Sequence, residues 1–161
     1  MAGIFSLTES ILENPIFSGL EEKSAEDLAK HCEVLLLPPN RKVFQQGDEA
    51  QEMFVLFRGR LEIRVEDLAG EEHVVGTLSK GEVFGEMGVL DSTKRSASCY
   101  TAEDSVLLRI PGSGFSKMIK QGNPAVHRLL QFSLEKACSR LRSLDQRLDQ
   151  IFAEDSKRKQ G

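Results

Sequence analysis

The sequence predicts a mainly β fold: an antiparallel barrel or roll with short helices before it and one long helix after it. Between Cys32 and Ile110, short apolar runs alternate with glycine-containing turns, which is typical of antiparallel β architectures. Before this region, apolar residues recur at helical spacing. After it, a helical pattern runs from Pro124 to Phe152 with no breaker. These three observations set the fold class.

The composition is that of one folded domain. The chain has 161 residues, 40% of them hydrophobic and 29% charged, with a net charge of −4. This acidic balance disfavours an extended nucleic-acid interface. No apolar run approaches the ~20 residues that a membrane span requires, and residues 1–8 lack the basic and apolar regions of a signal peptide. We expect a cytoplasmic protein that has neither nucleic acid nor a membrane as a partner.

The patterns divide the chain into four segments. Residues 1–31 form an N-terminal helical segment that Asn14-Pro15 interrupts, and Ser24 is expected to cap its second helix. Residues 32–122 form the β region, residues 123–152 the long helix and residues 153–161 a flexible polar tail. The apolar face of the first helix consists of Ile4, Phe5, Leu7, Ile11 and Leu12.

The β region is expected to contain short strands separated by turns. The run from Met53 to Phe57 is apolar throughout, so it should be buried on both faces, whereas alternation from Leu61 predicts a half-exposed strand. Pro111-Gly112 should end the last strand, and Ser113 should cap a short helix. The expected strands are Val34–Leu37, Lys42–Gln45, Met53–Arg58, Leu61–Val65, His73–Leu78, Ser96–Ala102 and Val106–Ile110.

Residues 81–99 offer groups for an anion and for hydroxyls. Three glycines fall within eight residues there, and Met87–Leu90 is expected to form one helical turn whose opening amides face outward. Arg95 adds a planar guanidinium suited to a phosphate, and the hydroxyl of Ser96 lies beside it in the sequence. Glu86 makes sense as an acceptor for hydroxyls. A phosphate together with a diol describes a nucleotide.

The run Phe84-Gly85-Glu86-Met87-Gly88-Val89-Leu90, followed by Arg95-Ser96-Ala97-Ser98, resembles the phosphate-binding cassette of cyclic-nucleotide-binding domains. That family includes bacterial catabolite activators, kinase regulatory subunits and gated channels. The resemblance implies a jelly-roll-like β-roll in which Gly85 donates its backbone N–H near the ligand. It also implies that Glu86 binds the ribose 2′-OH, that Arg95 binds the cyclic phosphate and that Ser96 adds a hydroxyl. Lys94 departs from the pattern, since kinase-type members usually carry proline there. The implied cassette residues are Phe84, Gly85, Glu86, Met87, Gly88, Val89, Arg95, Ser96 and Ala97.

The resemblance favours cAMP as the ligand and leaves cGMP as the alternative. A hydroxyl after the phosphate-binding arginine suits guanine in some members and the phosphate in bacterial activators, and Ser96 supplies one. No metal is expected, because His31, His73 and His127 lack ligand spacing to one another. No nucleophile or metal-assisted arrangement for hydrolysis is present, so we expect a receptor with no catalytic residues.

Residues 123–152 carry a heptad pattern. The repeat predicts that part of the helix packs on the same helix of a second copy, with Arg140 and Asp145 flanking the seam. The alternative is a helix that lies along its own roll. The resemblance implies that residues on this helix close over the base, and the candidates are Arg140, Arg142 and Ser143. The seam consists of Leu130, Leu134, Ala137, Leu141, Leu144, Leu148 and Ile151.

The expected output is a signal passed through a homodimer or to a protein effector. The family's transcription factors continue into a helix-turn-helix, whereas this chain ends soon after the heptads, so we do not expect it to read DNA. The rival interpretation is a structural or assembly module, a roll scaffold with an oligomerising helix and an unused pocket. Glu86 and Arg95 together weigh against it, since a buried carboxylate and guanidinium are costly without a ligand.

Overall fold

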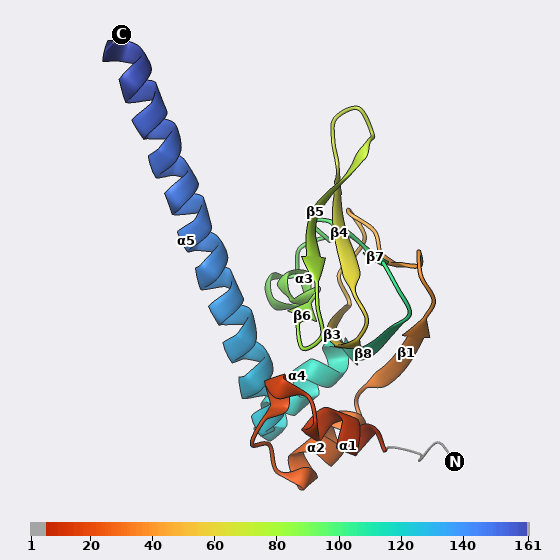
Figure 1. Ribbon diagram of the computed structural model, residues 1–161. Helices are drawn as coiled ribbons and strands as arrows, with labels where there is room; N and C mark the ends of the chain where they lie inside the picture. Colours follow the sequence, from red (N-terminus) through yellow and green to blue (C-terminus); the bar gives the residue numbers. More distant parts are fainter. Residues whose placement is uncertain (1–5, 161) are drawn as a thin grey trace. The chain divides into compact units, whose positions relative to one another are not determined.

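The computed structural model describes residues 6–160, and these form two β-sheets with helices before and after them (Figure 1). The chain divides after Leu129 into two compact units, residues 1–129 and residues 130–161. The first unit contains the N-terminal helices, both sheets, the helix α4 and the first turns of α5. The second unit is the rest of α5.

Three short helices precede the sheets: α1 (Leu7–Leu12), the 3-10 helix η1 (Pro15–Phe17) and α2 (Glu22–Ala29). A reciprocal capping box starts α1, because Ser6 Oγ accepts from the Glu9 amide at 3.1 Å and Glu9 Oε2 accepts from the Ser6 amide at 2.8 Å. The predicted Ser24 cap is wrong: α2 begins at Glu22, so Ser24 lies inside the helix. Ile4 and Phe5, predicted on the apolar face, lie outside the described residues.

The strands form two four-stranded antiparallel sheets, which confirms the predicted fold class. The first sheet has the order β1-β8-β3-β6 and the second the order β2-β7-β4-β5. Every predicted strand is present, and no end is shifted by more than two residues. The strands are β1 (Glu33–Leu37), β2 (Lys42–Phe44), β3 (Glu52–Arg58), β4 (Leu61–Glu66), β5 (Glu72–Leu78), β6 (Val83–Phe84), β7 (Ser98–Thr101) and β8 (Ser105–Pro111).

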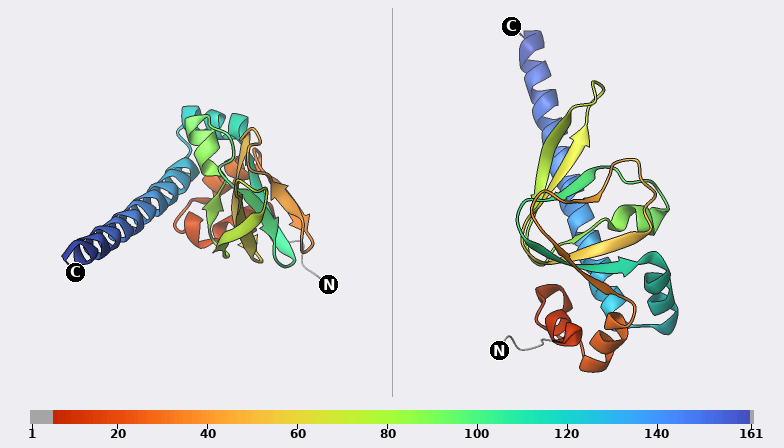
Figure 2. Two further views of the ribbon diagram at one scale, coloured as in Figure 1. Left: turned by 90° about the horizontal axis from the view of Figure 1, so that it is seen from above. Right: turned by 90° about the vertical axis from the view of Figure 1, so that its right-hand side faces the viewer.

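The main apolar core lies between the two sheets. The first sheet contributes Leu56 and Leu107, the second contributes Leu61 and Cys99, and all four side chains are fully buried. The sheets curl around this core, as the right-hand view of Figure 2 shows. Strand β3 is buried on both of its faces, as its unbroken apolar run predicts, because Val55 is buried on the side opposite Leu56.

The connection from β8 to α4 differs from the prediction. Strand β8 includes Pro111, which lies opposite Glu52 of β3, and α4 (Gly112–Gln121) begins at the next residue. Proline is tolerated here because it ends the strand and its fixed φ suits the residue before a helix. The predicted Ser113 cap is therefore wrong, since Ser113 lies within the first turn of α4.

The long helix α5 runs from Pro124 to Gln160, past the predicted end at residue 152. The polar segment that follows Phe152 contains no glycine or proline before Gly161, and an ion pair of 2.8 Å joins Lys159 to Asp155 one turn earlier. The heptad leucines of this helix are exposed: Leu141 is 61% and Leu148 49% accessible. A search of the described helices for a stretch apolar and long enough to span a bilayer finds none.

Packing between the sheets should dominate the stability of the roll. Replacing the fully buried Leu56 by alanine should lower the free energy of unfolding by about 2–5 kcal/mol, because it removes apolar contacts and leaves a cavity. Leu36, on β1, is 74% exposed, and its replacement by alanine should change that free energy by less than about 0.5 kcal/mol. Urea-induced unfolding measures both, and equal losses would contradict the assigned core.

Candidate functional site

The segment that joins the two sheets carries the candidate site. Strand β6 ends at Phe84, Gly85 turns the chain in the left-handed region with φ 69°, and the short helix α3 (Glu86–Asp91) follows (Figure 1). Ser92 is also left-handed, with φ 59°, and it ends α3 before the chain reaches Arg95 and β7. The predicted helical turn over Met87–Leu90 is therefore present and one residue longer at each end.

Two glycines of this segment are required by close packing. A Cβ on Gly88 would collide with Ala50 and lie 2.5 Å from the carbonyl oxygen of Thr93. A Cβ on Gly85 would lie 2.8 Å from Nη1 of Arg95, in addition to the strain of a positive φ. Both positions therefore need glycine because α3 is pressed against the chain that carries Arg95.

Arg95 lies at the centre of the site, and only 6% of it is exposed. Its Nη1 donates to the carbonyl oxygen of Gly85 and its Nη2 to that of Glu52, both at 2.6 Å. Its guanidinium carbon lies 4.2 Å from the ring centroid of Phe44 and 5.9 Å from that of Phe54. Within residues 6–160, the buried Nε of Arg95 has no hydrogen-bond partner.

The charge of Arg95 is partly uncompensated. Burial lowers the pKa of the guanidinium, and the carboxylates of Glu52, Asp48 and Glu86 oppose this effect. A guanidinium remains protonated at neutral pH even so, because its pKa starts well above that range. The candidate site therefore contains a buried cation with an unpartnered hydrogen-bond donor. An anion would complement both the charge and the donor.

Glu86 is the first residue of α3 and is also buried, with 6% of it exposed. A carboxylate at the start of a helix is favoured by the helix dipole, which explains why the position tolerates a buried charge. No hydrogen bond or ion pair within the described residues involves this carboxylate, and its charge interaction is with Arg95. Glu86 and Arg95 are thus two buried charged residues close enough to interact, and Arg95 retains a donor without a partner.

The other predicted site residues have different surroundings. Phe84 is buried and stacks on Phe54 with the ring centroids 5.2 Å apart. Met87 is 48% exposed, Ser96 is exposed, and Val89 and Ala97 are half-buried. Their predicted contacts with a ligand, and the predicted N–H donation by Gly85, stay predictions.

Arg140, Arg142 and Ser143 lie in the second unit, on the exposed surface of α5. The hydroxyl of Ser143 donates to the carbonyl oxygen of Ser139 at 3.1 Å, within its own helix. The predicted role of these three residues over the base stays a prediction.

Sequence reasoning did not assign several groups that hold Arg95. The Gly47 amide donates to the Arg95 carbonyl and the Arg95 amide to the Asp48 carbonyl, both at 2.9 Å, so the turn before β3 fixes the arginine's backbone. The Gly47-Asp48 pair is visible in the sequence as a turn. No pattern in the sequence predicts the roles of the Phe44 ring and the Glu52 carbonyl, because these roles depend on the fold rather than on a motif.

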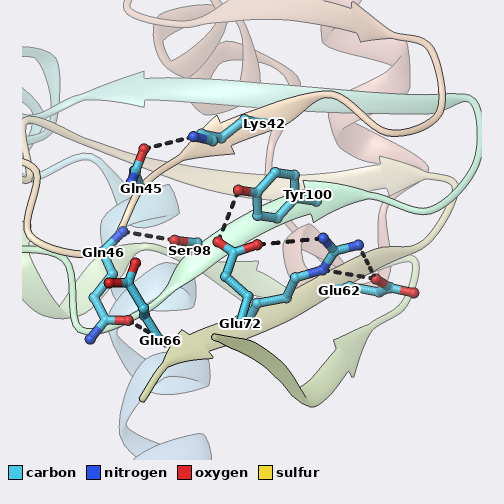
Figure 3. Close-up of polar contacts among 9 residues, drawn as sticks. Lys42, Gln45, Gln46, Glu62, Glu66, Glu72, Ser98 and Tyr100 are labelled. Carbon is cyan, nitrogen blue, oxygen red and sulfur yellow. Dashed lines mark hydrogen bonds and ion pairs between the residues drawn. The ribbon is translucent and has the colours of Figure 1, made fainter. Parts of the chain in front are cut away.

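A second polar cluster lies on the outer face of the second sheet (Figure 3). Arg64 pairs with Glu62 at 2.7 Å and with Glu72 at 3.6 Å, and its guanidinium lies 4.4 Å from the ring centroid of Tyr100. The hydroxyl of Tyr100 donates to Glu72 at 3.0 Å. The arginine's charge is paired within the cluster, so this cluster ties β4, β5 and β7 together and is a weaker candidate for a ligand.

Among residues 6–160, no group of three or more His, Cys, Asp or Glu side chains could hold a metal ion. Burial raises the pKa of Cys32 to about 12, so its thiol stays protonated at neutral pH and is a poor nucleophile.

Comparison with known proteins identifies the roll. Residues 34–122, more than half of the chain, match the family described as "Cyclic nucleotide-binding domain". The chain belongs to this family. The match includes all of β1 except its first residue, the cassette and α4, so the buried Glu86 and Arg95 lie inside the family's domain.

The curated relatives described next are longer proteins than this chain. The chain is 29% identical over 144 residues to the "Cyclic AMP receptor protein" of Thermus thermophilus, covering 89% of this chain and 65% of the relative. It is 30% identical over 102 residues to the cAMP-dependent protein kinase regulatory subunit of Mycosarcoma maydis, covering 62% of this chain and 19% of the relative. The chain thus spans less than two thirds of the length of either.

Solved structures agree with the fold. The Thermus thermophilus catabolite activator protein superposes with a TM-score of 0.71 at 31% identity, covering 86% of this chain and 63% of that chain. A cyclic nucleotide-binding domain from Methylobacillus flagellatus gives the same TM-score at 16% identity, covering 88% and 79%. The second likeness supports the fold alone.

Close packing at Gly88 should be essential to the cassette. Replacing Gly88 by alanine should lower the free energy of unfolding by about 1–3 kcal/mol, because the new methyl group meets Ala50 and Thr93. Gly76 on β5 is the matched control, since a Cβ there meets nothing within 4 Å and its φ is not positive. Chemical denaturation compares the two variants, and an equally mild effect at Gly88 would contradict this packing.

Proposed function

We propose that the chain is a cyclic-nucleotide sensor and that cAMP is its preferred ligand. The observation that carries the proposal is the pair of buried charges in the cassette, the Arg95 guanidinium with its unpartnered Nε and the Glu86 carboxylate. A ligand that carries both an anion and a hydroxyl donor completes both groups. A cyclic nucleotide has this combination in its phosphate and its ribose.

In this proposal the cyclic phosphate lies against Arg95 and the ribose 2′-OH donates to Glu86. The phosphate neutralises a cation whose charged form burial disfavours, so binding should be tighter than an exposed ion pair allows. Ser96 is exposed beside Arg95 and adds a hydroxyl to the phosphate or the base. We assign no catalytic role to these groups, and the proposed binding requires no metal ion.

The choice of cAMP over cGMP follows from the relatives. The Thermus thermophilus relative is named a cyclic AMP receptor, and the Mycosarcoma maydis relative a cAMP-dependent kinase regulatory subunit. The hydroxyl of Ser96 is compatible with either base, so cGMP is the alternative ligand.

In this proposal, α5 transmits the signal of ligand binding. Its exposed heptad leucines pair with those of a second copy in a parallel dimer, where Arg140 flanks the seam opposite Asp145 of the other chain. A ligand changes a protein only through unequal affinity for two states, and here the second state differs in how α4 and α5 are held. The dimer then presents its helices to a protein effector in the cytoplasm, without contacting nucleic acid or a membrane.

Arg95 should be required for stabilisation by nucleotide. At a cAMP concentration 100 times the dissociation constant, the melting temperature of the wild-type chain should rise by about 5–10 °C. Replacement of Arg95 by lysine or alanine should abolish this rise, because the phosphate loses its planar donors. Differential scanning fluorimetry measures the shift, which a metal chelator should leave unchanged.

The matched control is Arg60→Ala, since Arg60 is exposed and lies outside the cassette. This variant should keep the full cAMP shift, and cGMP should give the wild-type chain a smaller shift than cAMP. A wild-type chain that shows no shift with either nucleotide, or an Arg95 variant that keeps its shift, would contradict the assigned site.

The heptad seam should hold the dimer. Replacing Leu141 by glutamate places a charge in the seam and should shift the chain from dimer to monomer in sedimentation equilibrium. Gln146→Glu adds the same charge on the opposite side of the helix and should leave the dimer intact. A wild-type chain that is monomeric at every concentration tested would contradict this part of the proposal.

A further inference from the structure

A polar cleft of about 490 Å³ lies on the helical side of the first unit. Its walls are α2, α4 and the start of α5, and none of its lining residues belongs to the cassette. Basic side chains outnumber acidic ones along it. The lining residues with charged or titratable side chains are Lys23, Lys30, His31 and Lys117 on the basic side and Glu21 and Asp27 on the acidic side.

Besides the internal ion pair, the cleft contains two lysines that make no ion pair of their own with described residues, although the charge of Lys23 also acts on Asp27. Lys30 donates to Asp27 at 3.0 Å, and this bond lowers the pKa of Asp27 and raises that of Lys30, so both stay charged. Neither Lys23 nor Lys117 takes part in a hydrogen bond or ion pair with another described residue. The cleft is therefore locally positive in a chain whose net charge is −4.

The walls of the cleft are held at fixed distances. A Cβ on Gly114 would lie 3.1 Å from the His31 carbonyl oxygen, so α4 approaches the end of α2 closely, and Lys117 lies one turn further along the same face of α4. Asn123 is 6% exposed, and its amide nitrogen donates to the Ser24 carbonyl at 3.3 Å. A pre-formed cleft needs little reorganisation to receive a ligand.

We propose that this cleft binds an acidic segment of a protein partner, whose carboxylates pair with Lys23 and Lys117. Sites for small organic molecules are mostly apolar, whereas this cleft is lined by polar and charged side chains, so it suits the side chains of a peptide better. Charge complementarity favours an acidic partner, because the ammonium groups of Lys23 and Lys117 attract it and the net negative charge of the chain repels it elsewhere. The proposal does not depend on nucleotide binding.

A dye-labelled hexaglutamate peptide tests the cleft. Fluorescence anisotropy at low ionic strength, where exposed charges are least screened, should show saturable binding to the full chain. The double variant Lys23→Gln, Lys117→Gln should weaken binding about tenfold, because two exposed charge pairs are lost. In the wild-type chain, the side-chain amide NMR signals of Gln121 and Asn123 should shift on titration, which localises the peptide independently of the variants.

The double variant Lys80→Gln, Lys120→Gln is the control, since it removes the same net charge from exposed lysines outside the cleft. It should bind the peptide as the wild type does, and both double variants should unfold at the wild-type temperature. Equal weakening by the two doubles would overturn the proposal by showing non-specific attraction. Displacement of the peptide by inorganic phosphate at matched charge would also overturn it, because the cleft would then be a phosphate site.

Discussion

The burial of one guanidinium governs the arrangement of the site. Arg95 is removed from water and held by two backbone carbonyls, from Gly85 and Glu52, which lie far apart in the sequence and meet only when the roll is formed. The ring of Phe44, from a third part of the chain, covers its face. A buried cation is stable only if the nearby groups accept its hydrogen bonds or pack on its face. The fold and the cassette therefore depend on each other.

The roll supplies that placement through close packing. Gly85 and Gly88 let α3 approach Arg95 and the residue Ala50 without side chains between them. The turn at Gly47 and Asp48 fixes the backbone of Arg95 on the other side. Two groups of the site are still available for hydrogen bonds: the Nε of Arg95 and the buried carboxylate of Glu86. These groups suit the site to a ligand.

Much of the fold was predictable because burial imposes a period on the sequence. The unbroken apolar run of β3 and the alternation in β4 both led to correct strands. Strand β6 was not predicted, since two residues are too few to show a period, and the Ser24 and Ser113 caps were wrong because caps depend on local geometry. The long helix continues past residue 152, where its apolar pattern stops but nothing in the sequence breaks it. In the site, the motif identified Glu86 and Arg95, yet the Glu52 carbonyl carries no side-chain signature and could come only from the structure.

A crystal structure of the chain grown with cAMP would test the role of Arg95 and Glu86 most directly. The cyclic phosphate should lie within hydrogen-bonding distance of the Arg95 guanidinium, and the ribose 2′-OH should donate to the Glu86 carboxylate. A nucleotide bound at any other place, with Arg95 still held only by the Gly85 and Glu52 carbonyls, would contradict these roles.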